Sequence, residues 1–161
     1  MTTAEYNLCV DEHADGVFRF ILKNMRDEEG ARDVVQEAFT RMWERVDTIS
    51  FEKSKSYLFT SAYHIMIDAL RKTGRQTSFE EVSYDKSSSD RHYSDLKEVL
   101  DEAVKRLPEV QRSALLLRDY EGYSYKEIGD MLALSESQVK VYIFRARVAM
   151  KEYLVDADLV I

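Results

Sequence analysis

The chain has 161 residues, of which 45% are hydrophobic and 33% are charged, and its formal net charge is −7 at pH 7. This composition is typical of a folded, surface-rich protein with one ordinary domain or two small ones, and no segment approaches the roughly 18 uninterrupted apolar residues of a membrane span. With one proline and five glycines there are few helix breakers, and strictly alternating strand-like runs are hard to find, so the predicted fold class is all-α.

The cysteine content and the N-terminal stretch indicate the compartment. A single cysteine, Cys9, excludes an internal disulfide and has no Cys or His partners at metal-ligand spacing, which favours a reducing environment and a role as a small apolar residue. The first sixteen residues show no basic n-region and no apolar core of signal-peptide length. We therefore expect a soluble, cytoplasmic protein without membrane insertion.

The first part of the chain predicts two amphipathic helices. From Glu5 to Met25 the apolar residues are dense and helically spaced, and the stretch RDEEG then makes a break. The segment 31–49 carries an apolar stripe at steps of three and four, including Ala38, Met42 and Trp43, and a polar opposite side. This pattern is a strong prediction of a helix with one exposed face.

A basic, aromatic segment follows. The residues SFEKSKS, Ser50–Ser56, are short and polar and predict a loop, and the next sixteen residues predict a helix. That helix places Tyr57, Tyr63 and His64 away from its apolar side and close to cations. Exposed aromatic residues beside cations are common where proteins stack unpaired bases.

Composition then changes in a way that predicts a linker. Thr73–Ser94 is a stretch of 22 residues with six serines, mixed charges and scattered hydrophobic residues, too polar to order itself by burial. The predicted organisation is a first domain over residues 1–73, a linker over 74–94 and a second domain over 95–161. Fully extended, such a linker reaches roughly 70–80 Å, so the two halves could move far apart, and the sequence leaves their relative placement open.

The second half predicts a helix-turn-helix. A helix over Leu96–Leu107 ends at Pro108, and the next helix is stopped by Gly122. Two further helices each open with a capping-box pattern, Ser124 with a Glu and Ser135 with a Gln three residues on. Two capped helices joined by a tight turn are the sequence form of a helix-turn-helix.

The last helix has two distinct faces. At 100° per residue, one face is apolar and predicted to pack on partner helices: Val139, Tyr142, Ile143, Ala146, Met150 and Tyr153. The far face is basic but also apolar: Ser137, Gln138, Lys140, Val141, Phe144, Arg145, Val148 and Lys151. A helix in the major groove can place apolar groups against thymine methyls and sugars while Lys and Arg hold phosphates. A C-terminal helix that uses the same stripe to dimerise or bind a protein is the alternative.

Charge is distributed in two basic islands within an acidic body. Residues 50–77 carry five cations against two anions, and residues 137–151 carry four cations and no anion, so the rest of the chain sums to −14. Because phosphate attraction follows local charge over about a Debye length of 10 Å, two islands suggest two contacts with a polyanion. Two ordinary solvated faces are the alternative.

Together these motifs resemble a known family. The segments DVVQEAFTRMW and LPEVQRSALLLRDYEGYSYKEIGDMLALSESQVKVYIFRAR are similar to the extracytoplasmic-function group of bacterial sigma-70 factors, which have only regions 2 and 4. The resemblance covers nearly the whole chain in the right order. It implies a factor that binds core RNA polymerase, through the β′ clamp and the β flap, and directs initiation at −10 and −35 promoter elements.

The resemblance also implies roles for particular residues. On the β′ clamp it implies Asp33, Gln36, Glu37, Phe39 and Trp43. At the −10 element, where a base is flipped out, it implies Lys53, Lys55, Tyr57, Tyr63, His64, Arg71 and Lys72. At the −35 element it implies Tyr125, Lys126, Glu136, Ser137, Gln138, Lys140, Val141, Phe144, Arg145, Arg147 and Lys151, of which Glu136 to Lys140 would read bases and Arg145 to Lys151 would hold the backbone.

Three positions depart from the family pattern. Tyr57 stands where many relatives have Trp, and His64 stands where they often have Asn, which leaves the −10 base preference undetermined. Ala133 occupies the turn position where Gly is frequent. The family further implies an anti-sigma partner, for which the apolar stripe on the last helix is a candidate site.

Two other function classes compete with this interpretation. A conventional DNA-binding regulator accounts for the helix-turn-helix but leaves the basic aromatic helix without a role. An enzyme is disfavoured, since the sequence shows no Gly-rich phosphate loop, no metal-ligand cluster and no triad, and His13, His64 and His92 lie in three separate segments. We therefore expect no catalytic residues, no metal and no cofactor.

Overall fold

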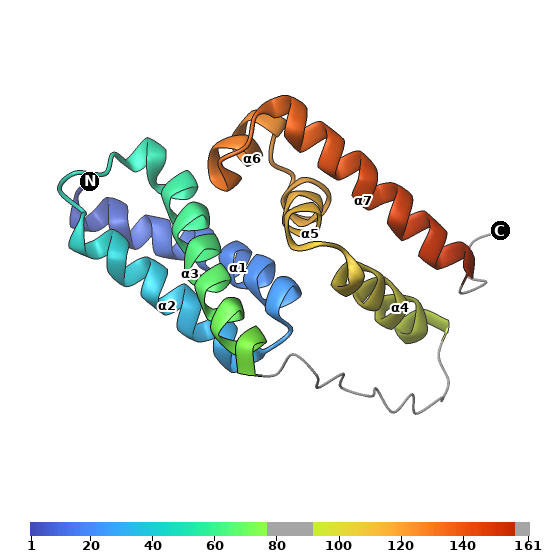
Figure 1. Ribbon diagram of the computed structural model, residues 1–161. Helices are drawn as coiled ribbons and strands as arrows, with labels where there is room; N and C mark the ends of the chain where they lie inside the picture. Colours follow the sequence, from blue (N-terminus) through green and yellow to red (C-terminus); the bar gives the residue numbers. More distant parts are fainter. Residues whose placement is uncertain (77–91, 157–161) are drawn as a thin grey trace.

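The computed structural model describes residues 1–76 and 92–156, which fold into helices without any strand and so confirm the predicted all-α class (Figure 1). None of the helices in these two ranges has the length and apolar character needed to cross a membrane. The first half contains α1 (Thr3–Met25), α2 (Glu28–Glu44), the 3-10 turn η1 (Phe51–Lys53) and α3 (Ser54–Gln76). The second half contains α4 (His92–Arg106), α5 (Glu109–Leu115), the π-helical turn η2 (Leu116–Tyr120), α6 (Tyr125–Leu132) and α7 (Glu136–Asp156).

The first half is a bundle of three helices. In α2 the buried residues Ala31, Val34, Ala38 and Met42 recur at steps of three and four, so one face packs on α1 and α3. The break between α1 and α2 is shorter than the sequence pattern suggested, because only Arg26, in the left-handed conformation at φ 59°, and Asp27, which is extended, separate the two helices. The opposite face of α2 is left exposed.

Helices extend into segments that the sequence predicted to be irregular. The predicted loop Ser50–Ser56 is wrong in part, because the 3-10 turn η1 leads directly into α3 at Ser54. At the predicted linker, α3 continues to Gln76 and α4 already begins at His92. The remainder of the linker prediction, residues 77–91, lies outside the described residues.

The predicted helix-turn-helix is confirmed by both of its capping boxes. Ser124 and Glu127 exchange backbone-to-side-chain hydrogen bonds of 3.1 Å each at the start of α6, and Ser135 and Gln138 do so at 2.9 and 3.1 Å before α7. Between the two helices, Ala133 takes the left-handed conformation at φ 57°. The turn closes tightly, so a Cβ placed on Gly129 would lie only 2.6 Å from the carbonyl oxygen of Leu134.

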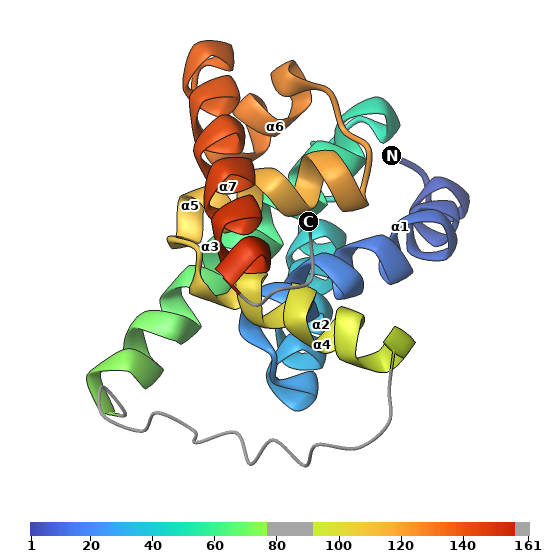
Figure 2. The same ribbon diagram turned by 90° about the vertical axis from the view of Figure 1, so that its right-hand side faces the viewer.

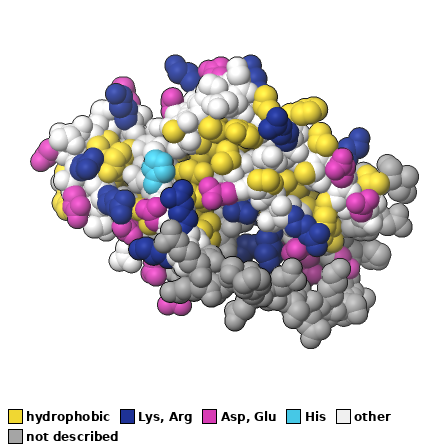
Figure 3. All heavy atoms as spheres, viewed as in Figure 1, with side chains coloured by type: hydrophobic (Ala, Val, Ile, Leu, Met, Phe, Trp, Pro, Cys, Tyr) yellow, Lys and Arg dark blue, Asp and Glu magenta, His cyan; other side chains and the backbone are white. Residues whose placement is uncertain are grey.

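Helix α7 has the two faces predicted from its sequence. Val139, Ile143 and Ala146 are fully buried and pack toward α4, α5 and α6, while Tyr142, Met150 and Tyr153 are half-buried. The opposite face is exposed along its whole length, with Phe144 68% exposed. Hydrophobic and basic side chains are interspersed over the part of the surface where α7 lies (Figure 3).

The two halves pack against each other and share one continuous hydrophobic core. Phe20, Phe59 and Met66 of the first half belong to the same buried cluster as Leu117 and Ile128 of the second half. Helix α3 lies against α6, and α1 against α5 and η2 (Figure 2). The sequence left this placement open; the structure shows the halves in contact rather than apart.

The helix-turn-helix turn generates a paired stability prediction. Gly129→Ala should lower the free energy of unfolding by about 1–3 kcal/mol, because the new methyl group meets the Leu134 carbonyl. Ala133→Gly should raise it by about 0.5–1 kcal/mol, because glycine removes the left-handed strain. Thermal unfolding followed by circular dichroism measures both variants, with about 2–4 °C in Tm expected per kcal/mol. A stabilised Gly129→Ala variant would show that the turn is built differently.

Candidate functional site

The exposed face of α2 carries the residues predicted to contact polymerase. Asp33, Gln36 and Glu37 are exposed, and Glu37 pairs with Arg41 one turn later at 2.6 Å. The exposed side of this helix therefore carries acidic and amide groups together with the arginines Arg32 and Arg41. Because α2 packs on α1 and α3, this face stays open while the two halves are in contact.

Two aromatic side chains of α2 complete that surface. Trp43 is 46% exposed, and its ring meets the ring of Tyr6 edge-on at a centroid distance of 4.9 Å. Phe39 is half-buried against the core, and its carbonyl accepts a 2.9 Å hydrogen bond from the Tyr6 hydroxyl. A large apolar ring held rigidly beside polar groups is typical of an anchoring residue in a protein interface. Tyr6, which the sequence did not single out, is its support.

The residues predicted to contact the −10 element divide into three groups. Lys53, Lys55 and Tyr57 come together around the corner where η1 meets α3. His64, Arg71 and Lys72 lie further along α3 and are exposed.

Tyr63 is the exception, because the structure contradicts its expected exposure. It is buried, as is Ile67, and its hydroxyl donates a 3.0 Å hydrogen bond to Glu109 of α5. Burial first, and the Glu109 carboxylate second, raise the pKa of Tyr63 above its ordinary value. The expected exposure was wrong because the second half covers this side of α3.

The corner between η1 and α3 opens onto a cleft of about 780 Å³. Its walls come from η1, the first turns of α3, α1 and α6, and its lining residues include Glu12, His13, Thr60, Glu127 and Asp130. The sequence predicted Glu127 only as part of a capping box and did not place these five residues together, since only tertiary packing brings α1 and α6 to this corner.

His13 gives the cleft a neutral group. Burial, with the positive charge of Lys55 acting in the same direction, keeps the pKa of His13 below its ordinary value, and Glu12 opposes this. The imidazole is therefore mostly uncharged at neutral pH and can both donate and accept hydrogen bonds. No group of three or more His, Cys, Asp or Glu within residues 1–76 and 92–156 is arranged to hold a metal ion.

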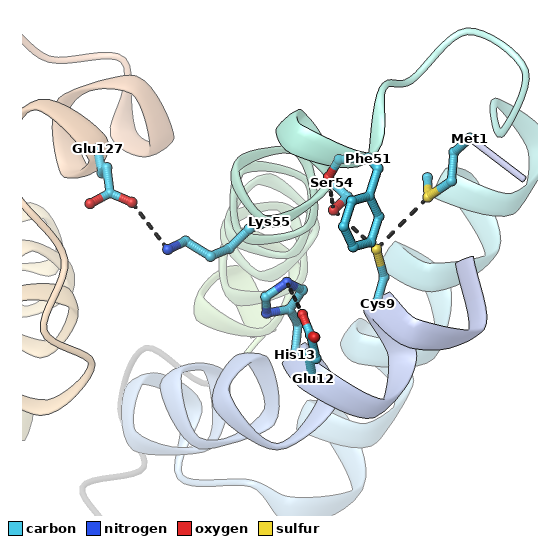
Figure 4. A network of polar contacts seen from close by, with 8 residues as sticks. All are labelled: Met1, Cys9, Glu12, His13, Phe51, Ser54, Lys55 and Glu127. Atoms are coloured by element: carbon cyan, nitrogen blue, oxygen red, sulfur yellow. Dashed lines mark hydrogen bonds and ion pairs between the residues drawn. The ribbon is translucent and has the colours of Figure 1, made fainter. Parts of the chain in front are cut away.

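The second half closes one side of this cleft through Lys55. The Lys55 ammonium lies 3.1 Å from Oε2 of Glu127 (Figure 4). It also lies 4.2 Å from the centre of the Tyr123 ring, so one cation of the predicted −10 surface is held by the second half. The hydrogen bond from the Ser124 backbone, and then the contact with Lys55, lower the pKa of Glu127. Tyr123 also packs edge-on against Phe59 at 5.1 Å.

A bidentate ion pair joins the halves beside this contact. The guanidinium of Arg19 in α1 donates to both carboxylate oxygens of Glu121 at 3.1 and 2.9 Å. The side chain of Glu121 is only 4% exposed, and this hydrogen bond raises the pKa of Arg19. Glu121 follows the π-helical turn η2 at the end of α5. Its amide donates to the Leu116 carbonyl five residues earlier, and this turn places its side chain next to α1.

A third contact buries polar groups between α1 and α5. Asn24, itself buried, accepts hydrogen bonds from Arg112 at 2.8 Å and from Ser113 at 3.3 Å, and donates to the Phe20 carbonyl. Burial lowers the pKa of Arg112, an effect opposed by Glu109 and Tyr63. Buried polar groups that are hydrogen-bonded across an interface fix its geometry, so the packing of the halves is specific.

The residues predicted to read the −35 element lie at the exposed start of α7. Glu136, Ser137 and Lys140 are free of the core. Gln138 already uses its Oε1 to accept from the Ser135 amide, so the predicted base contact would use its Nε2. Tyr125 is half-buried, with Lys140 at 5.6 Å over its ring, and Lys126 is exposed beside it.

The cations further along α7 are not equivalent. Arg145 and Lys151 are exposed on the basic face with Val141 and Phe144. Arg147 instead donates to both oxygens of Asp119 at 3.2 and 2.6 Å, and this contact raises its pKa. In this structure Arg147 therefore joins α7 to η2.

Comparison with protein families matches both halves. Residues 9–76 match the family described as Sigma-70 region 2, and residues 97–150 match Sigma-70, region 4. The chain is 30% identical over 144 residues to the ECF RNA polymerase sigma factor SigM of Bacillus subtilis (strain 168), covering 86% of this chain and 88% of that protein. It is 27% identical to the RNA polymerase sigma factor SigV of the same organism, covering 94% and 92%.

Two solved structures share the fold. The sigma factor RpoE in complex with the anti-sigma factor NepR from Bartonella quintana superposes with a TM-score of 0.75 at 22% identity, covering 92% of this chain and 96% of that one. CnrH in complex with the cytosolic domain of CnrY superposes with a TM-score of 0.72 at 22% identity, covering 95% and 88%. At this identity the likeness establishes the fold.

The ion pair between the halves generates a charge-reversal prediction. Arg19→Glu should separate the halves in part, because it leaves the buried Glu121 carboxylate without its partner and adds a like charge, at a cost of about 1–3 kcal/mol. Exchanging both charges, Arg19→Glu with Glu121→Arg, should restore the packing. Small-angle X-ray scattering measures the radius of gyration, which should rise in the Arg19→Glu protein and return to the wild-type value in the double variant.

A surface pair supplies the control. Arg32→Glu breaks the exposed pair that Arg32 makes with Glu28 within α2 and should leave the radius of gyration unchanged. An equal expansion in the Arg32→Glu and Arg19→Glu proteins would show that net charge, and not the specific pair, controls the packing.

Proposed function

The chain belongs to the extracytoplasmic-function group of the sigma-70 family, and from this membership we propose that it binds core RNA polymerase and directs transcription initiation at specific promoters. The observation that carries the proposal is the match of both sigma regions, in order, over most of the chain. Such a factor contributes binding and promoter melting, while the polymerase performs catalysis. Its place of action is the cytoplasm, together with the polymerase and the promoter.

We propose that the two halves divide this work. Region 2, over residues 1–73, would dock on the β′ clamp through the exposed face of α2 and hold the −10 strand at the η1–α3 corner. Region 4, over residues 95–161, would read the −35 element with the start of α7 and contact the β flap. Residues 74–94 would connect them, with the first and last few residues extending α3 and α4.

The packed arrangement fits a factor that depends on polymerase. The Lys55 ammonium is held by Glu127, and α5 covers Tyr63, so part of the −10 surface is occupied by the same chain. The docking face of α2 remains exposed. We propose that the free factor binds promoter DNA weakly and that polymerase, entering through α2, separates the halves and makes both promoter contacts intramolecular.

We further propose control by an anti-sigma factor. One of the similar solved structures is a sigma factor, RpoE, in complex with the anti-sigma factor NepR, and another is CnrH in complex with the cytosolic domain of CnrY. The exposed apolar residues Val141, Phe144 and Val148 of α7 are the candidate docking stripe. Occupation of that stripe would cover the −35 face.

Association with core polymerase tests the function directly. Replacing Asp33 and Gln36 together by Ala should weaken binding to purified core polymerase by at least about tenfold, because interface energy concentrates in a few residues of the docking face. Glu98→Ala removes one exposed acidic group from α4 and should bind like the wild-type protein. If the wild-type protein does not bind core polymerase but binds duplex DNA tightly, the result would favour the alternative of a conventional DNA-binding regulator.

The salt dependence of promoter binding separates the cations of α7. Arg145→Ala should lower the slope of log affinity against log salt by about 1, because an exposed arginine gives up one phosphate contact. Arg147→Ala should change that slope less, because Asp119 already neutralises this guanidinium. Holoenzyme binding to a promoter fragment between low and moderate salt provides the measurement, and equal slopes for the two variants would contradict the distinction.

A further inference from the structure

A buried polar contact connects the first helix to the corner that carries the −10 residues. Cys9 of α1 is 0% exposed and Ser54, the first residue of α3, is 2% exposed. The Cys9 thiol lies 3.0 Å from Oγ of Ser54 and 3.8 Å from Sδ of Met1, and the shorter contact is the donation to Ser54 (Figure 4). The Ser54 hydroxyl donates to the carbonyl oxygen of Phe51 at 2.6 Å. The buried hydroxyl thus uses both its donor and an acceptor site, as buried polar groups normally do.

The turn η1 is held to the rest of the protein by the packing of Phe51 and by the contacts of Ser54. The turn η1 contributes no fully buried residue, and two of its three residues, Glu52 and Lys53, are exposed. Phe51 is only half-buried, and its carbonyl accepts from both the amide and the hydroxyl of Ser54. Ser54 adds to the packing of Phe51 a hydrogen-bonded connection from η1 to α1 through Cys9.

This corner carries three of the residues predicted to contact the −10 element. Lys53 precedes Ser54, and Lys55 and Tyr57 follow it closely in the chain. All three line the cleft. A binding site works when the orientations of its contact residues are fixed by supporting hydrogen bonds behind them. The thiol of Cys9 occupies that supporting place.

We propose that Cys9 is a positioning residue for promoter opening: its thiol, acting through Ser54, fixes the η1–α3 corner in the orientation that captures the −10 strand. This inference rests on the proposed function. The sequence indicated only a small apolar residue at position 9, and that description is incomplete, because the side chain is both buried and a hydrogen-bond donor.

The substitutions Cys9→Ser and Cys9→Ala separate a donor from a space-filling group. Serine and alanine have nearly the same volume and both are smaller than cysteine, so they disturb the packing around α1 to a similar extent. Serine keeps a hydroxyl that can donate to Ser54, and alanine does not. A difference between the two variants therefore reports on the hydrogen bond.

The experiment uses holoenzyme reconstituted from core polymerase and each full-length variant. The rate of open-complex formation is followed by the fluorescence of a base analogue in the −10 region, and affinity for a duplex carrying the −35 element is measured in parallel. Cys9→Ala should slow opening about three- to tenfold, the range expected for one net hydrogen bond. Cys9→Ser should stay within about twofold of the wild type, and −35 affinity should be unchanged in both.

Val17→Ala supplies the matched packing control. Val17 lies on the same helix, is fully buried and has no hydrogen-bonding group in its side chain. Its truncation should lower Tm without slowing opening at a temperature well below the transition. If Cys9→Ala does not fold, Ser54→Ala removes the same relay from the other side and should show the same slowing.

The outcomes distinguish this inference from the proposed function. Equal slowing by Cys9→Ser and Cys9→Ala, or by Val17→Ala and Cys9→Ala, would overturn the positioning role and leave only core packing. Wild-type opening by a folded Cys9→Ala holoenzyme would overturn it as well. If the wild-type holoenzyme itself forms no open complex at any promoter, the proposed function fails instead.

Discussion

The carboxylate of Glu121, almost inaccessible to solvent and held in two hydrogen bonds by Arg19, is the contact on which the arrangement of the halves depends. Burying a carboxylate without a partner costs free energy. The second half is therefore most stable in the position where the Arg19 guanidinium of α1 pairs with Glu121. Around this pair the apolar residues of both halves join one core, and Tyr123 is carried to Phe59 and Lys55. Because the Arg19–Glu121 pair fixes the position of the second half, the second half also covers the η1–α3 corner.

That arrangement separates two surfaces of the same protein. Helix α2 has its main contacts with α1 and α3, both in the first half of the described chain. Its outer face is therefore exposed. The η1–α3 corner and Tyr63 lie on the side that the second half occupies. In the proposed function, polymerase would reach α2 first, and promoter DNA would reach the η1–α3 corner only after the halves separate.

Local features of the structure were predictable from the sequence, and contacts between distant segments were not. The capping boxes at Ser124 and Ser135, and the buried face of α7, depend on residues three or four positions apart, so their patterns are legible in the sequence. The burial of Tyr63 and the role of Cys9 depend on partners 46 and 45 residues away. No local pattern carries that information.

Family resemblance supplied the functional assignment, and the structure refined it by residue. The exposed face of α2 agrees with both the periodicity and the family pattern. The resemblance treated Arg147 and Arg145 alike, whereas the geometry separates them, because only the former faces Asp119. Such a distinction requires side-chain positions, since both residues belong to the same basic island.

The pairing of Lys55 with Glu127 and of Arg147 with Asp119 also has a consequence for the thermodynamics of DNA binding. In these two places the acidic body supplies the counterions of the basic islands from within the chain. When a DNA phosphate binds Lys55 or Arg147, the carboxylate that was paired with it is released. The released carboxylate then attracts cations from solution, and this uptake offsets part of the cation release from DNA. Fewer ions are then liberated overall than the number of phosphate contacts implies, and promoter recognition depends less steeply on the salt concentration of the cell.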